Sequence, residues 1–216
     1  MSDIFFTADS HFYHSNIIRH CHRPWLRAGD LDEQGNWAGE EIAVQRTEEM
    51  NEDLIKNWNE VVSPGDIVYH CGDFAFARAL AGREAVKKII RRLNSYKNIQ
   101  LILGNHDKKN LINKFKDFAW VGDTKCINVE GQMIFLSHYA HRVWDQSHRG
   151  SWNLVGHSHN NLTVARPDSV EGGLLLDVGV DVWDYKPISF DFVRGIMNTK
   201  KETMKQLGLM PHITGN

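Results

Sequence analysis

The sequence predicts an α/β fold, in which short buried strands alternate with amphipathic helices. Five runs of β-branched, aromatic and other apolar residues have the length of buried strands. Two segments between these runs repeat apolar residues at helical spacing. In addition, each of the five runs ends in polar residues that can bind a metal ion. The fold and a candidate site are therefore predicted by the same pattern.

The predicted strands carry their polar residues at one end. The runs, with the polar residues that close them, are Ile4–His11, Ile67–Asp73, Leu101–Asp107, Ile134–His138 and Leu154–His159. Sheets of α/β proteins gather ligands from the ends of different strands at one shared edge. We therefore expect the five polar clusters to meet in space.

Two helices are predicted between the strands. The first begins after Thr47, which we expect to be its N-cap, and ends at a Ser-Pro-Gly sequence. Its apolar positions are Met50, Leu54, Trp58 and Val61. The second lies between Arg83 and Asn94, and its apolar face is formed by Val86, Ile89, Ile90 and Leu93. Both helices are expected to cover a sheet.

The segment from residue 20 to about residue 43 lacks either periodicity. Pro24 and three glycines interrupt it, and polar residues predominate. We interpret it as a loop insertion that forms a flap over the site. At 216 residues the chain has the size of one domain, and we expect a single domain that spans residues 1–216.

The polar clusters contain oxygen and nitrogen donors and no thiolate. The candidate metal ligands are Asp9, His11, Asp73, Asn105, His138, His157 and His159. One divalent ion takes about four to six such donors, so seven donors suit two ions that share a carboxylate. If the chain is extended at the Asp-x-His and His-x-His pairs, both side chains of each pair point to the same side and can reach one ion.

Each cluster also has a structural interpretation. A lone histidine beside an apolar run is more often a structural residue than a ligand, and an aspartate after a strand often belongs to a turn or a helix cap. Five clusters in chain order, two of them compact pairs of donors, favour a metal centre.

These motifs resemble those of the calcineurin-like metallophosphoesterases. They are Asp9-Ser10-His11, Gly72-Asp73, Gly104-Asn105-His106-Asp107, His138 and Gly156-His157-Ser158-His159. The sequence Gly72-Asp73-Phe74-Ala75-Phe76 is similar to that of small stand-alone bacterial and phage-type members. The resemblance implies a metallophosphoesterase fold, a four-layer α/β/β/α sandwich of two packed mixed β-sheets flanked by helices. It also implies a dinuclear metal centre that hydrolyses phosphate esters.

The resemblance also implies a role for each residue of the centre. Asp9, His11 and His159 would hold one ion, and Asn105, His138 and His157 the other, with Asp73 between them. A water shared by two cations ionises near neutral pH, so a bridging hydroxide would attack the phosphate.

Two neighbours of Asn105 are the candidate catalytic residues. The resemblance implies that His106 faces the substrate and donates a proton to the leaving oxygen or a hydrogen bond to the phosphoryl group. We expect Asp107 to orient the imidazole of His106. Many relatives carry an acidic residue three places after the motif aspartate, where this chain has Phe76. We expect Phe76 to be a buried packing residue beneath the site.

Residues after His138 are candidates for substrate contact. Arg142 and Arg149 are suited to bidentate binding of phosphate, and His141 adjoins them. Solvent-facing positions are the alternative for these residues. Trp144 and Trp152 could stack on a nucleobase, although tryptophan more often packs in a core.

Composition excludes several classes of protein. The net charge is −2 and the isoelectric point is near 6.6, which argues against stable binding of duplex nucleic acid. The three cysteines have no metal-binding or disulfide spacing, which favours a reducing compartment. No apolar run has the length of a membrane span. We therefore expect a cytoplasmic protein without a membrane partner.

The sequence thus predicts a metal-dependent phosphoesterase with two divalent ions. Oxygen and nitrogen donors accept Mn, Fe, Zn, Co or Ni, of which we expect Mn. The resemblance favours phosphodiesters of nucleotide type as substrates. The alternatives are a phosphomonoesterase or phosphoprotein phosphatase, and a non-catalytic, metal-stabilised binding module.

Overall fold

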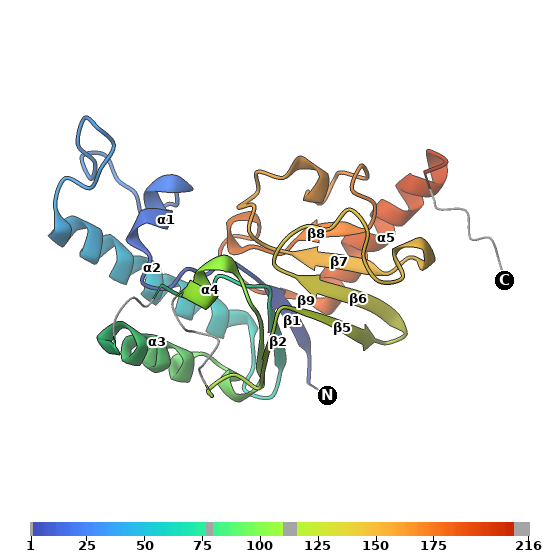
Figure 1. Cartoon of the computed structure of the whole chain (residues 1–216), viewed down its shortest axis with the longest axis horizontal. Helices are drawn as coiled ribbons and strands as arrows, with labels where there is room; N and C mark the ends of the chain where they lie inside the picture. Colours follow the sequence, from blue (N-terminus) through green and yellow to red (C-terminus); the bar gives the residue numbers. More distant parts are fainter. Residues whose placement is uncertain (1, 77–79, 110–115, 210–216) are drawn as a thin grey trace.

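The computed structural model describes residues 2–76, 80–109 and 116–209, arranged in two sheets with flanking helices (Figure 1). The strands are β1 (Ile4–Thr7), β2 (Ile67–His70), β3 (Ile99–Ile102), β4 (Trp120–Gly122), β5 (Thr124–Val129), β6 (Gln132–Ser137), β7 (Trp152–Val155), β8 (Leu175–Asp177) and β9 (Ile188–Ser189). The α-helices are α1 (Ser15–His20), α2 (Glu40–Val61), α3 (Leu80–Arg92), α4 (Asn105–Lys109) and α5 (Phe190–Gln206). Short 3₁₀ helices are η1 (Tyr96–Asn98), η3 (Ser147–Arg149), η4 (Thr163–Ala165) and η5 (Val180–Val182).

Both sheets are mixed. The five-stranded sheet has the order β4-β3-β2-β1-β9, in which only β9 is antiparallel to its neighbour. The four-stranded sheet has the order β5-β6-β7-β8, in which β5 is antiparallel to β6 and the other pairs are parallel. Two of the five predicted runs contain whole strands, β1 and β2, and the other three overlap the C-terminal parts of β3, β6 and β7.

The two faces of the first sheet pack against different partners. Phe5 and Leu101 belong to a core that they share with α2 and α3. Phe6, Tyr69 and Ile102, which alternate with such residues along the strands, belong to a second core shared with the four-stranded sheet. The two sheets therefore pack face to face, and α2 and α3 cover the outer face of the first.

The second sheet is covered differently. Its outer face includes Val155 and Leu175, which pack against Ala165 of η4 and neighbouring connecting residues. Helix α5 contributes Val193 and Met197 to the core between the sheets. The predicted α/β sandwich with two packed mixed sheets and flanking helices is confirmed.

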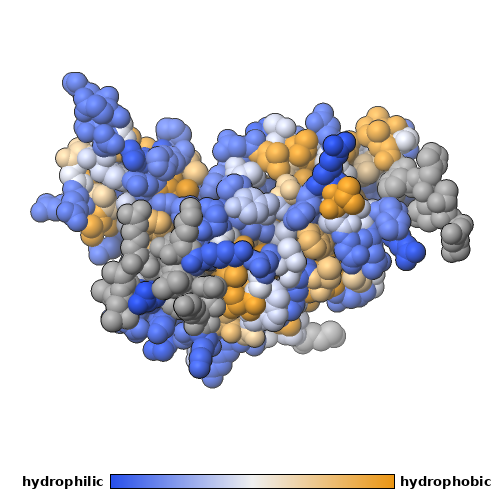
Figure 2. Space-filling model, viewed as in Figure 1, coloured by the Kyte–Doolittle hydropathy of each residue, from blue (hydrophilic) through white to orange (hydrophobic). Residues whose placement is uncertain are grey.

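The first predicted helix begins earlier than expected. Helix α2 starts at Glu40 after the extended residue Gly39, and the hydroxyl of Thr47 donates to the backbone oxygen of Ala43 within the helix. The prediction that Thr47 is an N-cap is therefore wrong. Residues 21–39 form a loop that protrudes beside α1 (Figure 1), and its outer end is hydrophilic (Figure 2). Its proposed function as a flap, and the single domain, stay predictions.

In the part of the chain that the structure describes, every helix is too short or too polar to cross a lipid bilayer.

Candidate metal centre

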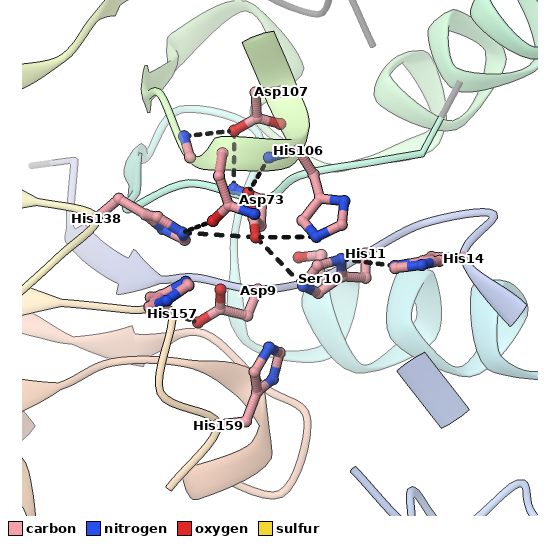
Figure 3. Close-up of polar contacts among 12 residues, drawn as sticks. Asp9, Ser10, His11, His14, Asp73, His106, Asp107, His138, His157 and His159 are labelled. Carbon is pink, nitrogen blue, oxygen red and sulfur yellow. Dashed lines mark hydrogen bonds and ion pairs between the residues drawn. The ribbon is translucent and has the colours of Figure 1, made fainter. Parts of the chain in front are cut away.

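The ends of five strands bring the candidate ligands together (Figure 3). Asp9 and His11 follow β1, Asp73 follows β2, and Asn105 follows β3 as the first residue of α4. His138 comes directly after β6, and the His157-Ser158-His159 sequence follows β7. Both sheets therefore supply the site from the same edge, as expected for parallel strands.

The ligand atoms form two groups. Those of Asp9, His11 and His159 all lie within 4.8 Å of one another, and so do those of Asp73, His138 and His157. The first group contains the three residues that the resemblance assigns to one ion, and the second contains His138 and His157, which it assigns to the other. Asn105 belongs beside the second group, since its Oδ1 lies 3.1 Å from Nε2 of His138.

Asp73 lies between the two groups. Its Oδ2 is 3.6 Å from Nε2 of His11 and 3.5 Å from Nε2 of His138. Its Oδ1 accepts a hydrogen bond from the backbone N–H of His106 at 2.8 Å. One carboxylate oxygen therefore faces both groups while the other is held by the backbone.

The donor set fits divalent cations. Asp9 Oδ1 and His11 Nε2 are buried and have no hydrogen-bond partner among the described residues. Buried polar atoms without a partner are costly unless a cation binds them. Burial raises the pKa of Asp9 to about 7 and lowers the pKa of His11, which keeps that imidazole neutral. A neutral imidazole is the form that ligates a metal.

Hydrogen bonds at Nδ1 set the tautomers of two histidines. Nδ1 of His138 lies 2.9 Å from the backbone oxygen of Cys71, and Nδ1 of His159 lies 2.7 Å from Oδ2 of Asp181. Since both partners only accept, both rings donate from Nδ1, which leaves Nε2 as the nitrogen that can face a cation. Each ring is thereby prepared to bind a cation through Nε2.

The backbone at the ligands is not extended. The φ angles of five candidate ligands are positive: Asp9 58°, His11 52°, Asp73 55°, His157 71° and His159 45°. The expectation of extended pairs was therefore wrong, and tight left-handed turns direct the side chains inward instead. Aspartate and histidine tolerate this region better than most residues, yet it costs about 1–2 kcal/mol per residue.

Gly104 allows the loops after β2 and β3 to approach each other. A Cβ atom at this position would lie 2.1 Å from Oδ1 of Asp73 and 2.4 Å from its backbone nitrogen. Any other residue would displace Asp73, so glycine is required by close approach.

His106 and Asp107 have different surroundings. The His106 side chain is 27% exposed, and its Nε2 lies 4.0 Å from Oδ2 of Asp73. Asp107 is fully buried, and its carboxylate accepts backbone N–H groups of Asp73, Phe74 and Gly104 at 2.7–2.9 Å. The expected orientation of the His106 ring by Asp107 is therefore wrong. Asp107 instead joins the loop that carries Asp73 to the start of α4.

Phe76 is only partly buried, contrary to expectation. Its ring stacks on His14 with centroids 4.3 Å apart, and it lies 5.8 Å from the ring of His106. Nδ1 of His14 is 3.1 Å from Nδ1 of His11. Phe76 and His14 thus form a wall of the site beside His11 and His106.

The candidate substrate contacts lie on the segment between β6 and β7. His141, Arg142 and Arg149 are exposed there, and the structure gives no contact between their side chains and the ligands in the described residues. Trp144 is partly buried and donates to the backbone oxygen of Ser151, whereas Trp152 is buried in the core and has no face for a nucleobase.

Sequence reasoning missed three residues of the centre. Tyr139 is half-exposed, and its ring lies 4.6 Å from that of His157. Arg23 and Asp181 are buried behind the first ligand group. No sequence pattern marks Arg23 and Asp181, which are single residues outside the motifs. Tyr139 directly follows His138, and this position is the signal that could have found it.

Comparisons with known proteins agree with the fold and the motifs. The model of the calcineurin-like phosphoesterase superfamily domain matches residues 50–180. An uncharacterized protein of Methanocaldococcus jannaschii is 32% identical over 193 residues, which cover 89% of this chain and 90% of the relative. A protein of unknown function from Aquifex aeolicus has a similar structure, with 22% identity, a TM-score of 0.61, and coverage of 91% of this chain and all of that chain. A phosphoesterase from E. coli aligns with 18% identity and a TM-score of 0.40, over 82% of this chain and 78% of its own.

Proposed function

Because this chain belongs to the calcineurin-like phosphoesterase superfamily, we propose that it is a phosphodiesterase that hydrolyses nucleotide-type diesters with two divalent ions. The coarser activity follows from the family: the protein is a metal-dependent phosphoesterase that acts on phosphate esters. The use of two ions, the preference for diesters and the identity of the metal are the proposed parts.

The position of Asp73 is the observation that supports two ions. Its Oδ2 faces His11 of one ligand group and His138 of the other, at 3.6 and 3.5 Å. We assign Asp9, His11 and His159 to one ion, Asn105, His138 and His157 to the second, and Asp73 to both. When bound, two such ions lower the pKa of a water between them and offset the charge of phosphoryl oxygens.

His106 is proposed to act on the leaving group. Its side chain is partly exposed, and its Nε2 faces Asp73 at 4.0 Å. From this position Nε2 is placed to donate a proton to the leaving oxygen, or a hydrogen bond to a phosphoryl oxygen. Asp107 supports the reaction indirectly, because it fixes the backbone of Asp73 and Gly104.

The preference for nucleotide diesters is supported by Tyr139. Its ring is 49% exposed beside His157, and its hydroxyl lies 3.3 Å from Oδ1 of Asn105. An exposed aromatic face next to the ions can stack on a base. Arg142, Arg149 and His141 stay candidates for more distant phosphate contacts.

Metal identity and location are further parts of the proposal. Nitrogen and oxygen donors suit several first-row metals, and we propose Mn(II). All three cysteines are free, which supports the reducing environment of the cytoplasm.

Metal depletion and restoration test this function. The purified protein is expected to hydrolyse bis(nitrophenyl) phosphate faster than nitrophenyl phosphate, to lose both activities after chelation and to regain them with Mn(II). Full activity in a preparation shown to be metal-free would refute the metal-dependent reaction. Faster turnover of the monoester would instead support a phosphomonoesterase.

The bridging role of Asp73 has its own test within this function. Asp73→Asn should cost more activity than the change of any single terminal ligand, because it affects both ion positions. The comparison variant is His157→Ala, whose ligand belongs to one group only. Wild-type turnover and two bound ions in Asp73→Asn would contradict the bridge.

A further inference from the structure

Arg23 is a fully buried arginine behind the first ligand group. It follows α1, and its side chain is 0% exposed. On one side its Nε and Nη2 each donate to the carboxylate of Asp181 at 2.8 Å. On the other side Nη2 donates to the backbone oxygen of Asp9 at 2.7 Å, and Nη1 to that of Ser10 at 3.1 Å. Arg23 therefore joins η5 to the loop that presents Asp9.

Asp181 continues this connection to a second ligand. Its Oδ2 accepts a hydrogen bond from Nδ1 of His159 at 2.7 Å, and its side chain is 7% exposed. Its Oδ1 and Oδ2 also accept from Nε and Nη2 of Arg23. The carboxylate is thus shared between the arginine and the imidazole.

A contribution to the stability of the fold does not explain why Arg23 and Asp181 form a buried ion pair. The desolvation of two buried charges offsets most of their attraction, so apolar residues of similar size often serve stability equally well. The planar guanidinium does fix the orientation of its partner, however, because its two N–H groups bind a carboxylate in one geometry. A carboxylate at Nδ1 of a metal-binding histidine fixes the ring and its tautomer.

We propose that Arg23 and Asp181 are positioning residues for the ion held by Asp9, His11 and His159. Arg23 fixes the backbone of Asp9 and Ser10, and Asp181 fixes the ring of His159 with Nε2 toward the ion. This inference rests on the ligand assignment of the proposed function.

The second ligand group lacks this arrangement in the described residues. There, Nδ1 of His138 donates to the backbone oxygen of Cys71, and His157 is exposed. A change at Asp181 should therefore weaken one ion and spare the other.

The chain offers a matched control for the loss of a buried ion pair. Asp30 and Arg46 form another bidentate pair, with Nε to Oδ2 at 2.7 Å and Nη2 to Oδ1 at 3.0 Å. Their side chains are 6% and 11% exposed. Both hydrogen bonds connect the 21–39 loop to α2, and the described contacts of Asp30 include no metal ligand.

The experiment compares manganese binding by the full chain in the wild type, Asp181→Asn and Asp30→Asn. Calorimetric titration gives the affinity of each ion, metal analysis after equilibrium dialysis gives the stoichiometry, and thermal melting without metal reports stability. We expect Asp181→Asn to weaken one of two ions by about 10–100-fold and to resemble a milder form of His159→Ala. Asp30→Asn should lower the melting temperature while both affinities are retained.

Two results would overturn the proposal. One is unchanged affinity for both ions in Asp181→Asn, and the other is an equal loss in Asp181→Asn and Asp30→Asn. A wild-type protein that binds no manganese would overturn the proposed function itself, so the two failures can be told apart.

Discussion

The His106 side chain lies beside Asp73 and is 27% exposed, so it can face a substrate from the solvent side of the site. A proton donor matters most when the departing oxygen is basic, since nitrophenolate leaves as an anion without help. We expect His106→Ala to lose about 10²–10⁴-fold in turnover on an alkyl or nucleoside ester, and clearly less on a nitrophenyl ester. Turnover on esters with graded leaving groups, with metal content measured in parallel, checks this.

The control for His106 is Asp107→Asn. Because Asp107 fixes the backbone of Asp73, Phe74 and Gly104, its replacement should reduce turnover on all esters alike and lower metal content. An equal loss across the series in His106→Ala would reject a proton donor and leave phosphoryl binding. Loss of an ion in that variant would show that the ligand assignment is mistaken.

At the residue scale, the site residues that the sequence predicts are those that come shortly after the end of a strand. Asp9, Asp73 and His138 each come within three residues of the end of a strand, so they lie at the shared edge of the sheets. Arg23 and Asp181 are 158 residues apart and meet only through the fold. The role of Asp107 could not be predicted either, because its partners are backbone N–H groups, which every residue type except proline carries.

At the scale of elements, Lys200 connects α5 to the second sheet. Its buried ammonium donates to the backbone oxygens of Ser169 and Leu175, at 2.5 and 2.9 Å. Burial lowers the pKa of Lys200 from 10.5 to about 8, and Asp168 only partly opposes this shift. Between these two pH values the unfolded chain binds a proton that the folded chain does not.

This shift predicts a pH dependence of stability. The free energy of unfolding should rise with pH from about 8 to 10.5, by up to about 3 kcal/mol from this group. Lys200→Met should lower stability overall and remove this rise, whereas Lys205→Met, at an exposed position of α5, should retain it. Urea unfolding at several pH values measures the effect. Parallel pH curves for the wild type and Lys200→Met would contradict the prediction.

Helix boundaries and short strands were the least predictable elements. The first two turns of α2 are mostly polar, and their buried positions include Arg46, whose charge is paired with Asp30. Periodicity of apolar residues therefore appears only from Met50 onward. Strands β4, β8 and β9 have three, three and two residues, too few for an alternating pattern to emerge.

At the scale of the whole molecule, metal binding is expected to stabilise the folded state by connecting the two sheets. Its candidate ligands come from the ends of strands in both sheets, so ions bind the folded chain and not the separated segments. At a free concentration of 100 times the dissociation constant, one ion stabilises the fold by about 2.7 kcal/mol. For a chain of this size, that corresponds to a rise in melting temperature of roughly 5–10 °C.

Thermal melting with and without Mn(II) measures this coupling. The rise should disappear with a chelator and be smaller in His159→Ala, which removes one ligand from the first group. An unchanged melting temperature across a manganese titration that saturates the protein would show that the ions do not connect the two sheets.

The left-handed backbone at five candidate ligands is strained, so a substitution that relieves the strain there can also remove a residue that the activity needs. Glycine adopts these angles without strain, so at an exposed position such as His157 it would relax the chain while it removes a metal donor. Selection of variants for heat resistance in the absence of metal ions would thus enrich glycine at these positions and yield stable, inactive proteins. Engineering of this enzyme for harsher conditions requires a screen for turnover in every round, and its gains must come from residues outside these turns.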